Sequence, residues 1–149
     1  VGGAAEPVAS AAHRLARQVL HFDADARQDP EALALAVERA YLRLRARLTG
    51  LIGLAGFNAL FARALRLARA DNPALERVTF DERVEMSLLG TRDYARAGTA
   101  DPAVVAAGLT SIFARAIGLL ITFIGEDLAL RLTREAWPEM SEGESVAEE

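Results

Sequence analysis

Two neighbouring carboxylates, Glu126 and Asp127, stand inside the most hydrophobic stretch of the chain, AIGLLITFIGEDLALRL at residues 116–132. A carboxylate in an apolar setting can transfer a proton, bind a ligand or form a buried ion pair. Neighbouring residues on a helix point about 100° apart, so these two cannot converge on one atom as a catalytic pair does. Asp127 can instead pair with Arg131, four residues further on.

Glu126 falls on the apolar side of the predicted helix and needs a partner there, because an unpaired buried charge is costly. We expect an arginine of another helix to supply it, with Arg63 and Arg43 as the candidates. On this interpretation, removing the Glu126 carboxylate destabilises the fold by about 3–5 kcal/mol. The alternative is a ligand-binding or catalytic role, in which case its removal changes stability little.

The basic residues offer a second kind of binding chemistry, and all 17 of them are arginine. Arg39, Arg43 and Arg47 repeat every four residues, so they could together contact phosphates or an anionic surface. A solvated helix face, with the aliphatic stems covering apolar neighbours, is the interpretation we favour.

Two segments of the chain resemble each other: AGFNALFARALRLA at residues 55–68 and AGLTSIFARAIGLL at residues 107–120 match at seven of fourteen positions. Arg63 and Arg115 occupy equivalent places in them. If the similarity is a duplication, the two segments are helices packed around a pseudo-twofold axis. In a chain this rich in alanine, coincidence is the other explanation.

The remaining polar residues do not form a recognisable catalytic or metal site. His13 and His21, with Asp23 and Asp25 nearby, lack the Glu-x-x-His spacing of di-iron bundles and indicate a solvated helix end. The chain has no cysteine, which excludes disulfides and thiol catalysis. It also has no phosphate-binding glycine loop, catalytic triad or dinucleotide motif. We therefore expect no metal, no cofactor and no catalytic residue, and an enzyme is the less favoured class.

Length and composition predict one globular domain, because 149 residues with 52% hydrophobic and 26% charged side chains can bury a core. The net charge of −4 is carried by the last eleven residues, which hold five glutamates and no basic residue. The nearly neutral remainder argues against nucleic acid and against a membrane surface as partners. The uncharged run between Arg115 and Glu126 is too short for a membrane span, and without a signal sequence we expect a cytoplasmic protein.

Helical periodicity dominates the chain between its two ends. Helices are predicted over residues 8–27, 29–50, 51–70 and 101–136, the second and fourth starting at Asp-Pro pairs that suit a helix N-terminus. Gly108, Gly118 and Gly125 could each bend the fourth helix. The predicted buried side of 51–70 holds Leu51, Leu54, Phe57, Phe61 and Leu65. Residues 72–100 lack periodicity: 77–80 could form a short strand or a link, 83–90 a turn or two of helix, and 91–100 a loop.

The predicted fold is therefore all-α, a bundle of four or five helices with a long, largely buried C-terminal helix. We expect one helical domain over residues 8–138, with a disordered N-terminus at 1–7 and a disordered acidic tail at 139–149. The C-terminal helix is apolar on two sides, and a third side is made mostly of small residues, so nearly its whole circumference needs covering.

This packing surface favours a protein–protein interaction or oligomerisation module, for example a bacterial signalling adaptor. Some of the Leu109–Phe123 face or of the Leu51–Phe61 face is left exposed unless a second copy covers it, so we expect a homodimer. Another protein or domain is the other possible partner. The alternative function is a small-molecule sensor or enzyme with a pocket near Glu126 and the arginine-bearing helices.

The acidic tail provides a first testable prediction. Residues 139–149 combine like charges with only two apolar side chains larger than alanine, so they have little surface to pack on the domain. Truncation after Pro138 should leave the melting temperature nearly unchanged in a thermal denaturation experiment. A loss of several degrees would show instead that the tail docks on an arginine-bearing face.

Overall fold

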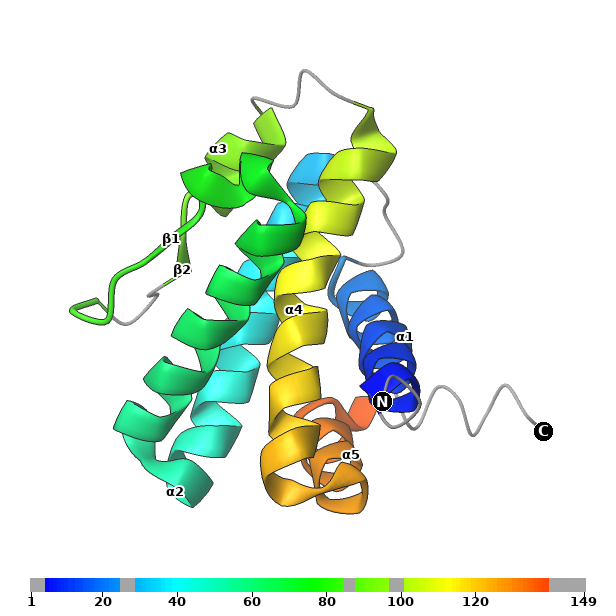
Figure 1. The fold of residues 1–149 in the computed structure, drawn as a ribbon, viewed down its shortest axis with the longest axis vertical. Helices are drawn as coiled ribbons and strands as arrows, with labels where there is room; N and C mark the ends of the chain where they lie inside the picture. The colour runs from blue at the N-terminus through cyan, green and yellow to red at the C-terminus, as the bar shows by residue number, and fades with distance from the viewer. Residues whose placement is uncertain (1–4, 25–28, 85–87, 97–100, 140–149) are drawn as a thin grey trace.

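The computed structural model describes residues 5–24, 29–84, 88–96 and 101–139. Within these residues the chain is all-α, as predicted, apart from one two-stranded sheet (Figure 1). In chain order the elements are α1 (Ala5–Asp23), α2 (Pro30–Asp71), the 3-10 helix η1 (Pro73–Arg77), β1 (Thr79–Phe80), β2 (Leu88–Leu89), α3 (Thr91–Arg96), α4 (Pro102–Ile124) and α5 (Glu126–Ala136). α1 begins inside the segment 1–7 that we expected to be disordered, and residues 140–149 of the predicted tail lie outside the described residues.

α2 is a helical hairpin. Its backbone leaves helical geometry at Gly53, where φ is 79° and ψ is 162°. The second segment then returns alongside the first, as Figure 1 shows. The two helices predicted over 29–50 and 51–70 are therefore present, but the break between them falls at Gly53 rather than at Gly50.

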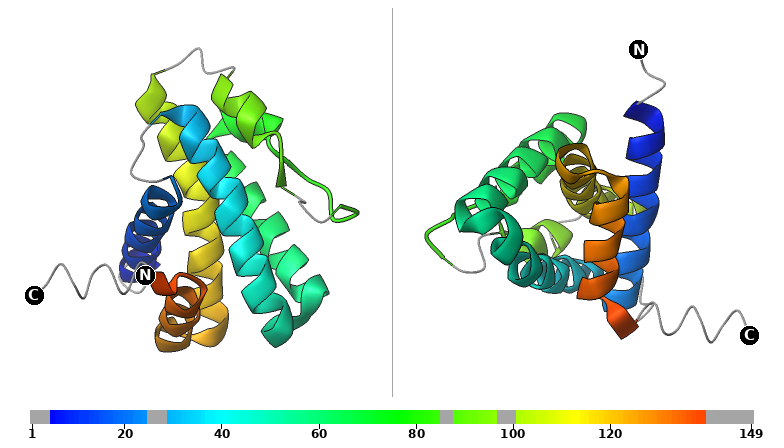
Figure 2. Two further views of the ribbon diagram at one scale, coloured as in Figure 1. Left: turned by 180° about the vertical axis from the view of Figure 1, so that it is seen from behind. Right: turned by 90° about the horizontal axis from the view of Figure 1, so that it is seen from below.

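The predicted C-terminal helix is also divided in two by a glycine. Gly125 has φ 89° and ψ 156°, and its N–H donates to the carbonyl of Ile121 at 2.8 Å, which ends α4. α5 starts at the next residue and turns across the end of the bundle (Figure 2). The long helix we expected over 101–136 is thus a buried helix, α4, followed by a shorter helix, α5, that is exposed along one side.

Both predicted Asp-Pro helix starts are confirmed. The Asp29 carboxylate accepts the backbone N–H of Ala32 at 3.1 Å, and the Asp101 carboxylate accepts that of Ala103 at 2.9 Å. In each helix the following proline takes the first helical position, where its missing N–H costs nothing. These local signals explain why α2 and α4 start where they do.

α4 lies at the centre of the fold. It runs with the two segments of α2 along the long axis of the molecule, and α1 crosses it (Figures 1 and 2). Small residues allow a close approach between α1 and α4: a Cβ atom built on Gly118 would lie 3.7 Å from the Cβ of Ala12. Ala12 and Ala16 of α1 are both buried at this contact.

Aromatic rings connect the helices through the core. The rings of Phe61 in α2 and Phe113 in α4 meet edge to face at 5.9 Å, and Tyr41 lies 4.9 Å from Phe61. Phe113 in turn lies 6.4 Å from the indole of Trp137, just beyond α5. All four rings are fully buried. Phe61 and Phe113 also occupy equivalent positions in the two similar segments, an arrangement that a pseudo-twofold axis between those helices would produce.

Three apolar side chains that we expected to be buried are exposed. Leu51 and Leu54 flank the α2 bend and are 51% and 47% exposed, and Phe123, near the end of α4, is 68% exposed. The prediction was wrong here because helical periodicity identifies residues that share a face but not whether another element covers that face. Phe57, Phe61 and Leu65, further along the same predicted face, are buried as expected.

The region between α2 and α4 contains more structure than its sequence indicated. β1 pairs antiparallel with β2, so Leu88 and Leu89 form a strand where we expected a turn of helix. The predicted loop over 91–100 was wrong for residues 91–96, which form α3. Two ion pairs fasten α3 to the first segment of α2: Arg92 to Glu38 at 3.0 Å and Arg96 to Glu31 at 3.1 Å.

The Gly125 break can be tested with a matched pair of glycine substitutions. G125A should lower the free energy of unfolding by about 1–3 kcal/mol, because only glycine adopts φ 89°, ψ 156° without strain. No neighbouring atom lies within 4 Å of a Cβ at either Gly125 or Gly50, so steric clash does not contribute. Gly50 lies within the first helical segment of α2, and G50A should therefore raise stability by about 0.5–1 kcal/mol. Urea denaturation that gives both variants the same stability would contradict this account of the break.

Candidate functional site

Arg39, Arg43 and Arg47, which we call the arginine stripe of α2, contact the C-terminal part of the chain and the end of α1. The Arg43 guanidinium donates to the Ala136 carbonyl at 2.9 Å and to the Glu139 carboxylate at 3.2 Å, and it lies over the Trp137 ring at 5.8 Å. Arg47 pairs with Glu135 of α5. These two side chains therefore serve protein contacts, which neither the solvated-face nor the anionic-surface interpretation anticipated.

A buried carboxylate, Asp23 at the end of α1, completes this contact. Its side chain is 4% exposed; it accepts the indole N–H of Trp137 at 3.0 Å and lies 3.7 Å from Nε of Arg43. Arg39, the third arginine of the stripe, donates to the backbone carbonyl of Asp23 at 3.1 Å. We call this set the C-terminal clasp. It consists of Asp23, Arg39, Arg43, Arg47, Glu135, Ala136, Trp137 and Glu139.

Burial raises the pKa of the Asp23 carboxyl above its ordinary value of 3.8. The hydrogen bond from Trp137 and the charges of Arg43 and Arg39 oppose this shift, and Glu139 adds to it. The loss of hydration therefore outweighs the favourable partners. The solvated helix end that we expected here is wrong for Asp23, which is buried. No local pattern in the sequence indicated this contact, because 114 residues separate Asp23 from the indole it binds.

Glu126 and Asp127 are not part of a buried site. Both are exposed in the first turn of α5, and neither forms an ion pair or side-chain hydrogen bond with any residue that the structure describes. The expected buried pair of Glu126 with Arg63 or Arg43 is thus wrong, and so is the cost of 3–5 kcal/mol attached to it. A carboxylate at this position instead interacts favourably with the positive end of the α5 dipole. Such an interaction stabilises a helix by about 0.3–1 kcal/mol.

The structure separates the other predicted site residues. Arg131 is exposed on α5, and its expected pair with Asp127 is not among the ion pairs of the described residues. Arg63 is exposed on the second segment of α2. Arg115, on α4, pairs with Asp71 at the end of α2. The five residues Glu126, Asp127, Arg131, Arg63 and Arg115 therefore do not form one site.

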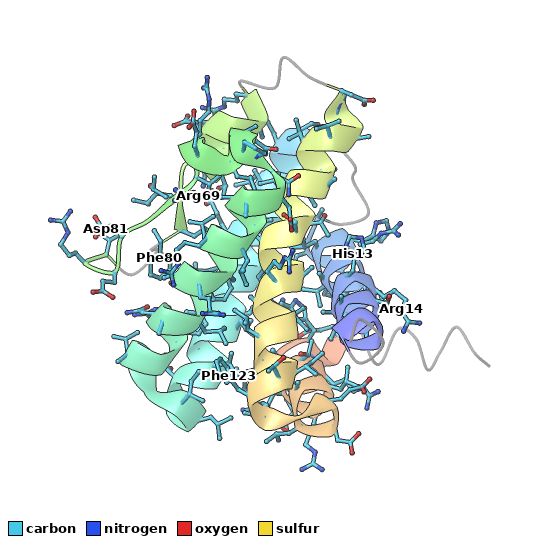
Figure 3. All side chains as sticks on the ribbon, in the orientation of Figure 1. His13, Arg14, Arg69, Phe80, Asp81 and Phe123 are labelled. Carbon is cyan, nitrogen blue, oxygen red and sulfur yellow. The ribbon has the colours of Figure 1, made fainter. Side chains whose placement is uncertain are left out.

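An apolar groove lies between the second segment of α2 and the end of α4; we call it the Phe123 groove. Its volume is about 430 Å³, and it is lined by Ile52, Gly56, Ala59, Leu60, Arg63, Arg66, Leu120, Phe123 and Ile124. Figure 3 shows Phe123 on this face of the molecule. The exposed Leu51 and Leu54 lie beside Ile52 in the sequence, at the α2 bend, but do not line the groove.

A second groove, of about 620 Å³, lies where α1, α2 and α4 meet; we call it the Arg115 groove. Its polar side chains are His13, Asp71, Ser111, Arg115 and Thr122. Figure 3 shows His13 on α1, on the far side of α4 from the α2 hairpin. Neither Glu126 nor Asp127 lines either groove.

Neither a metal cluster nor a membrane span is established. Over the described ranges there is no group of three or more His, Cys, Asp or Glu side chains that could hold a metal ion. By length and composition alone, α2 and α4 each contain an 18-residue stretch apolar enough to cross a membrane, with mean hydropathies of 1.5 and 2.0 for these stretches. More than half of this stretch of α4 is buried within the fold, as in a core helix.

No protein-family model matches the chain, and comparison with curated proteins and with solved structures likewise gave no match.

The C-terminal clasp predicts a specific pH dependence of stability. Because the folded-state pKa of Asp23 is raised, the folded protein holds this proton more tightly than the unfolded chain. The stabilising contribution of the protonated carboxyl is thus complete below pH 3.8 and is lost as pH rises through the folded pKa. In D23N the side-chain oxygen still accepts from Trp137 but no longer titrates. The stability of the natural protein minus that of D23N should therefore fall across this window.

Urea denaturation of both proteins at closely spaced pH values measures this difference, and the titrations common to both proteins cancel. A difference that rises with pH through the same window would mean that Arg43 and Arg39 outweigh burial, which contradicts the raised pKa.

Proposed function

We propose that the protein is a helical interaction module that forms a homodimer through the Phe123 groove. The observation that carries this proposal is the exposure of Phe123: a phenylalanine that is 68% exposed lines an apolar groove instead of joining the core. Aromatic side chains in such positions are typical anchors of protein interfaces. In a homodimer, the exposed Phe123 ring of one copy can pack into the Phe123 groove of the other copy.

The apolar surface extends beyond the groove. A stable interface covers about 800 Å² on each partner, so the contact must also include neighbouring side chains. Leu51 and Leu54, both about half exposed at the α2 bend, are the candidates, because they lie within two residues of Ile52, which lines the groove. Burying these leucines with Phe123 removes apolar area from water, the main driving force of association.

The Arg115 groove supports a second function, the binding of a small molecule. Its volume of about 620 Å³ falls within the range of ligand sites, and it combines apolar walls with His13 and the Arg115–Asp71 pair. A thermal-shift screen against metabolites and nucleotides distinguishes this function. A specific rise in melting temperature that R115A abolishes would favour it.

The dimer can be tested with a pair of charge substitutions on α4. F123D should weaken dimerisation at least about 30-fold, because losing an aromatic anchor costs about 2 kcal/mol or more. The matched control is V104D in the first turn of the same helix, where Val104 is 55% exposed and lines neither groove. V104D should dimerise like the natural protein.

Sedimentation velocity over a range of concentrations measures both effects. The natural protein should sediment at twice its monomer mass of 16.0 kDa, and F123D at the monomer mass. A natural protein that remains monomeric at every concentration would rule out the homodimer.

A further inference from the structure

The Phe123 groove has opposite charges at its two ends. Arg63 and Arg66 line it on α2, are exposed, and form no ion pair with any described residue. Glu126 and Asp127 follow Ile124, another lining residue, after the Gly125 break, and they too are exposed and unpaired among the described residues. No aspartate or glutamate lines the groove itself. Among the described residues, these four charges therefore have no ion-pair partner.

The direction of the helices separates the two charged groups along the groove. The second segment of α2 leads away from the bend at Gly53, so Arg63 lies about 15 Å along the helix from the bend. α4 runs in the opposite direction and ends near the bend, where α5 starts (Figure 1). The apolar surface around Phe123 thus has arginines toward one end and carboxylates at the other.

Such a surface is complementary to itself. A twofold axis that lies in the interface, perpendicular to the groove and midway between its two charged ends, reverses the groove direction in the second copy. The arginine end of each copy then faces the carboxylate end of the other. A parallel arrangement would instead place like charges opposite each other, which disfavours it.

We propose that the occupant of the Phe123 groove is a second copy of this chain in this antiparallel register. In it, Arg63 and Arg66 pair with Glu126 and Asp127 of the partner subunit, and vice versa. This inference rests on the proposed homodimer and specifies how its two copies are oriented. The apolar centre supplies most of the affinity, and the charges at the rim determine the orientation and which partner is accepted.

A charge-swap experiment tests the register. Each of the double variants R63E/R66E and E126R/D127R places like charges opposite each other in its own homodimer, so each should dimerise at least tenfold more weakly than the natural protein. In a one-to-one mixture, both sets of pairs have opposite signs again. The mixture should form heterodimers with an affinity within about threefold of the natural homodimer, as measured by native mass spectrometry or by fluorescence transfer between labelled copies.

The matched control for charge is R14E/R17E. Arg14 and Arg17 are exposed on α1 and line neither groove, and Figure 3 shows Arg14 away from Phe123. This variant makes the same change in net charge as R63E/R66E, but it should dimerise normally. Circular dichroism and the melting temperature of every variant establish that weakened association is not a loss of folding.

The possible outcomes separate this inference from the proposed function. If F123D breaks the dimer but the mixture shows no preference for heterodimers, the homodimer stands and the register is wrong. If only R63E/R66E loses association, the arginines face another acidic group, such as the C-terminal tail, and the inference fails. A natural protein that is monomeric but floats with vesicles containing anionic lipid would overturn both, with a membrane as the occupant.

Discussion

The edge-to-face contact between Phe61 and Phe113 holds the two main parts of the fold together. Phe61 belongs to the α2 hairpin, and Phe113 belongs to the central helix α4. Tyr41 extends the contact to the first segment of α2, and Trp137 extends it past α5. Since these rings occupy the interior, both segments of α2 turn their aromatic side chains inward, and Phe61 reaches α4. The outer faces of α2 and α4 are then left for arginines, the two grooves and the exposed apolar residues.

Trp137 makes the position of the C-terminal segment depend on a polar contact as well as on packing. Its ring is buried against Phe113, but its indole N–H needs an acceptor, and Asp23 provides one at the end of α1. Burying that carboxylate is costly, and Arg43 partly offsets the cost while also holding the Ala136 carbonyl. The arginine stripe of α2 therefore has a structural use, and a contact with phosphate or membrane would have to compete with Glu135 and Asp23.

The sequence predicted the parts of the fold that depend on local signals. Asp29 and Asp101, each followed by proline, mark the starts of α2 and α4, and periodicity identified Phe57 and Phe61 as buried. Contacts between distant residues had no such signal: Asp23 and Trp137 are 114 residues apart, and neither is unusual in its own segment. Glu126 was misplaced for a related reason, because its predicted burial assumed that the helix continued through Gly125.

The same two glycines explain the misplaced Glu126, Leu54 and Phe123 and the position of the candidate interface. Gly53 and Gly125 adopt nearly the same backbone conformation, with φ of 79° and 89° and ψ of 162° and 156°. Apolar periodicity continues across both positions, so it gives no sign that the chain changes direction there. Each break changes the direction of the chain while the apolar pattern continues. Leu54 and Phe123, which lie next to the breaks, are therefore left exposed. The candidate interface therefore lies where the helices end but the apolar sequence pattern continues.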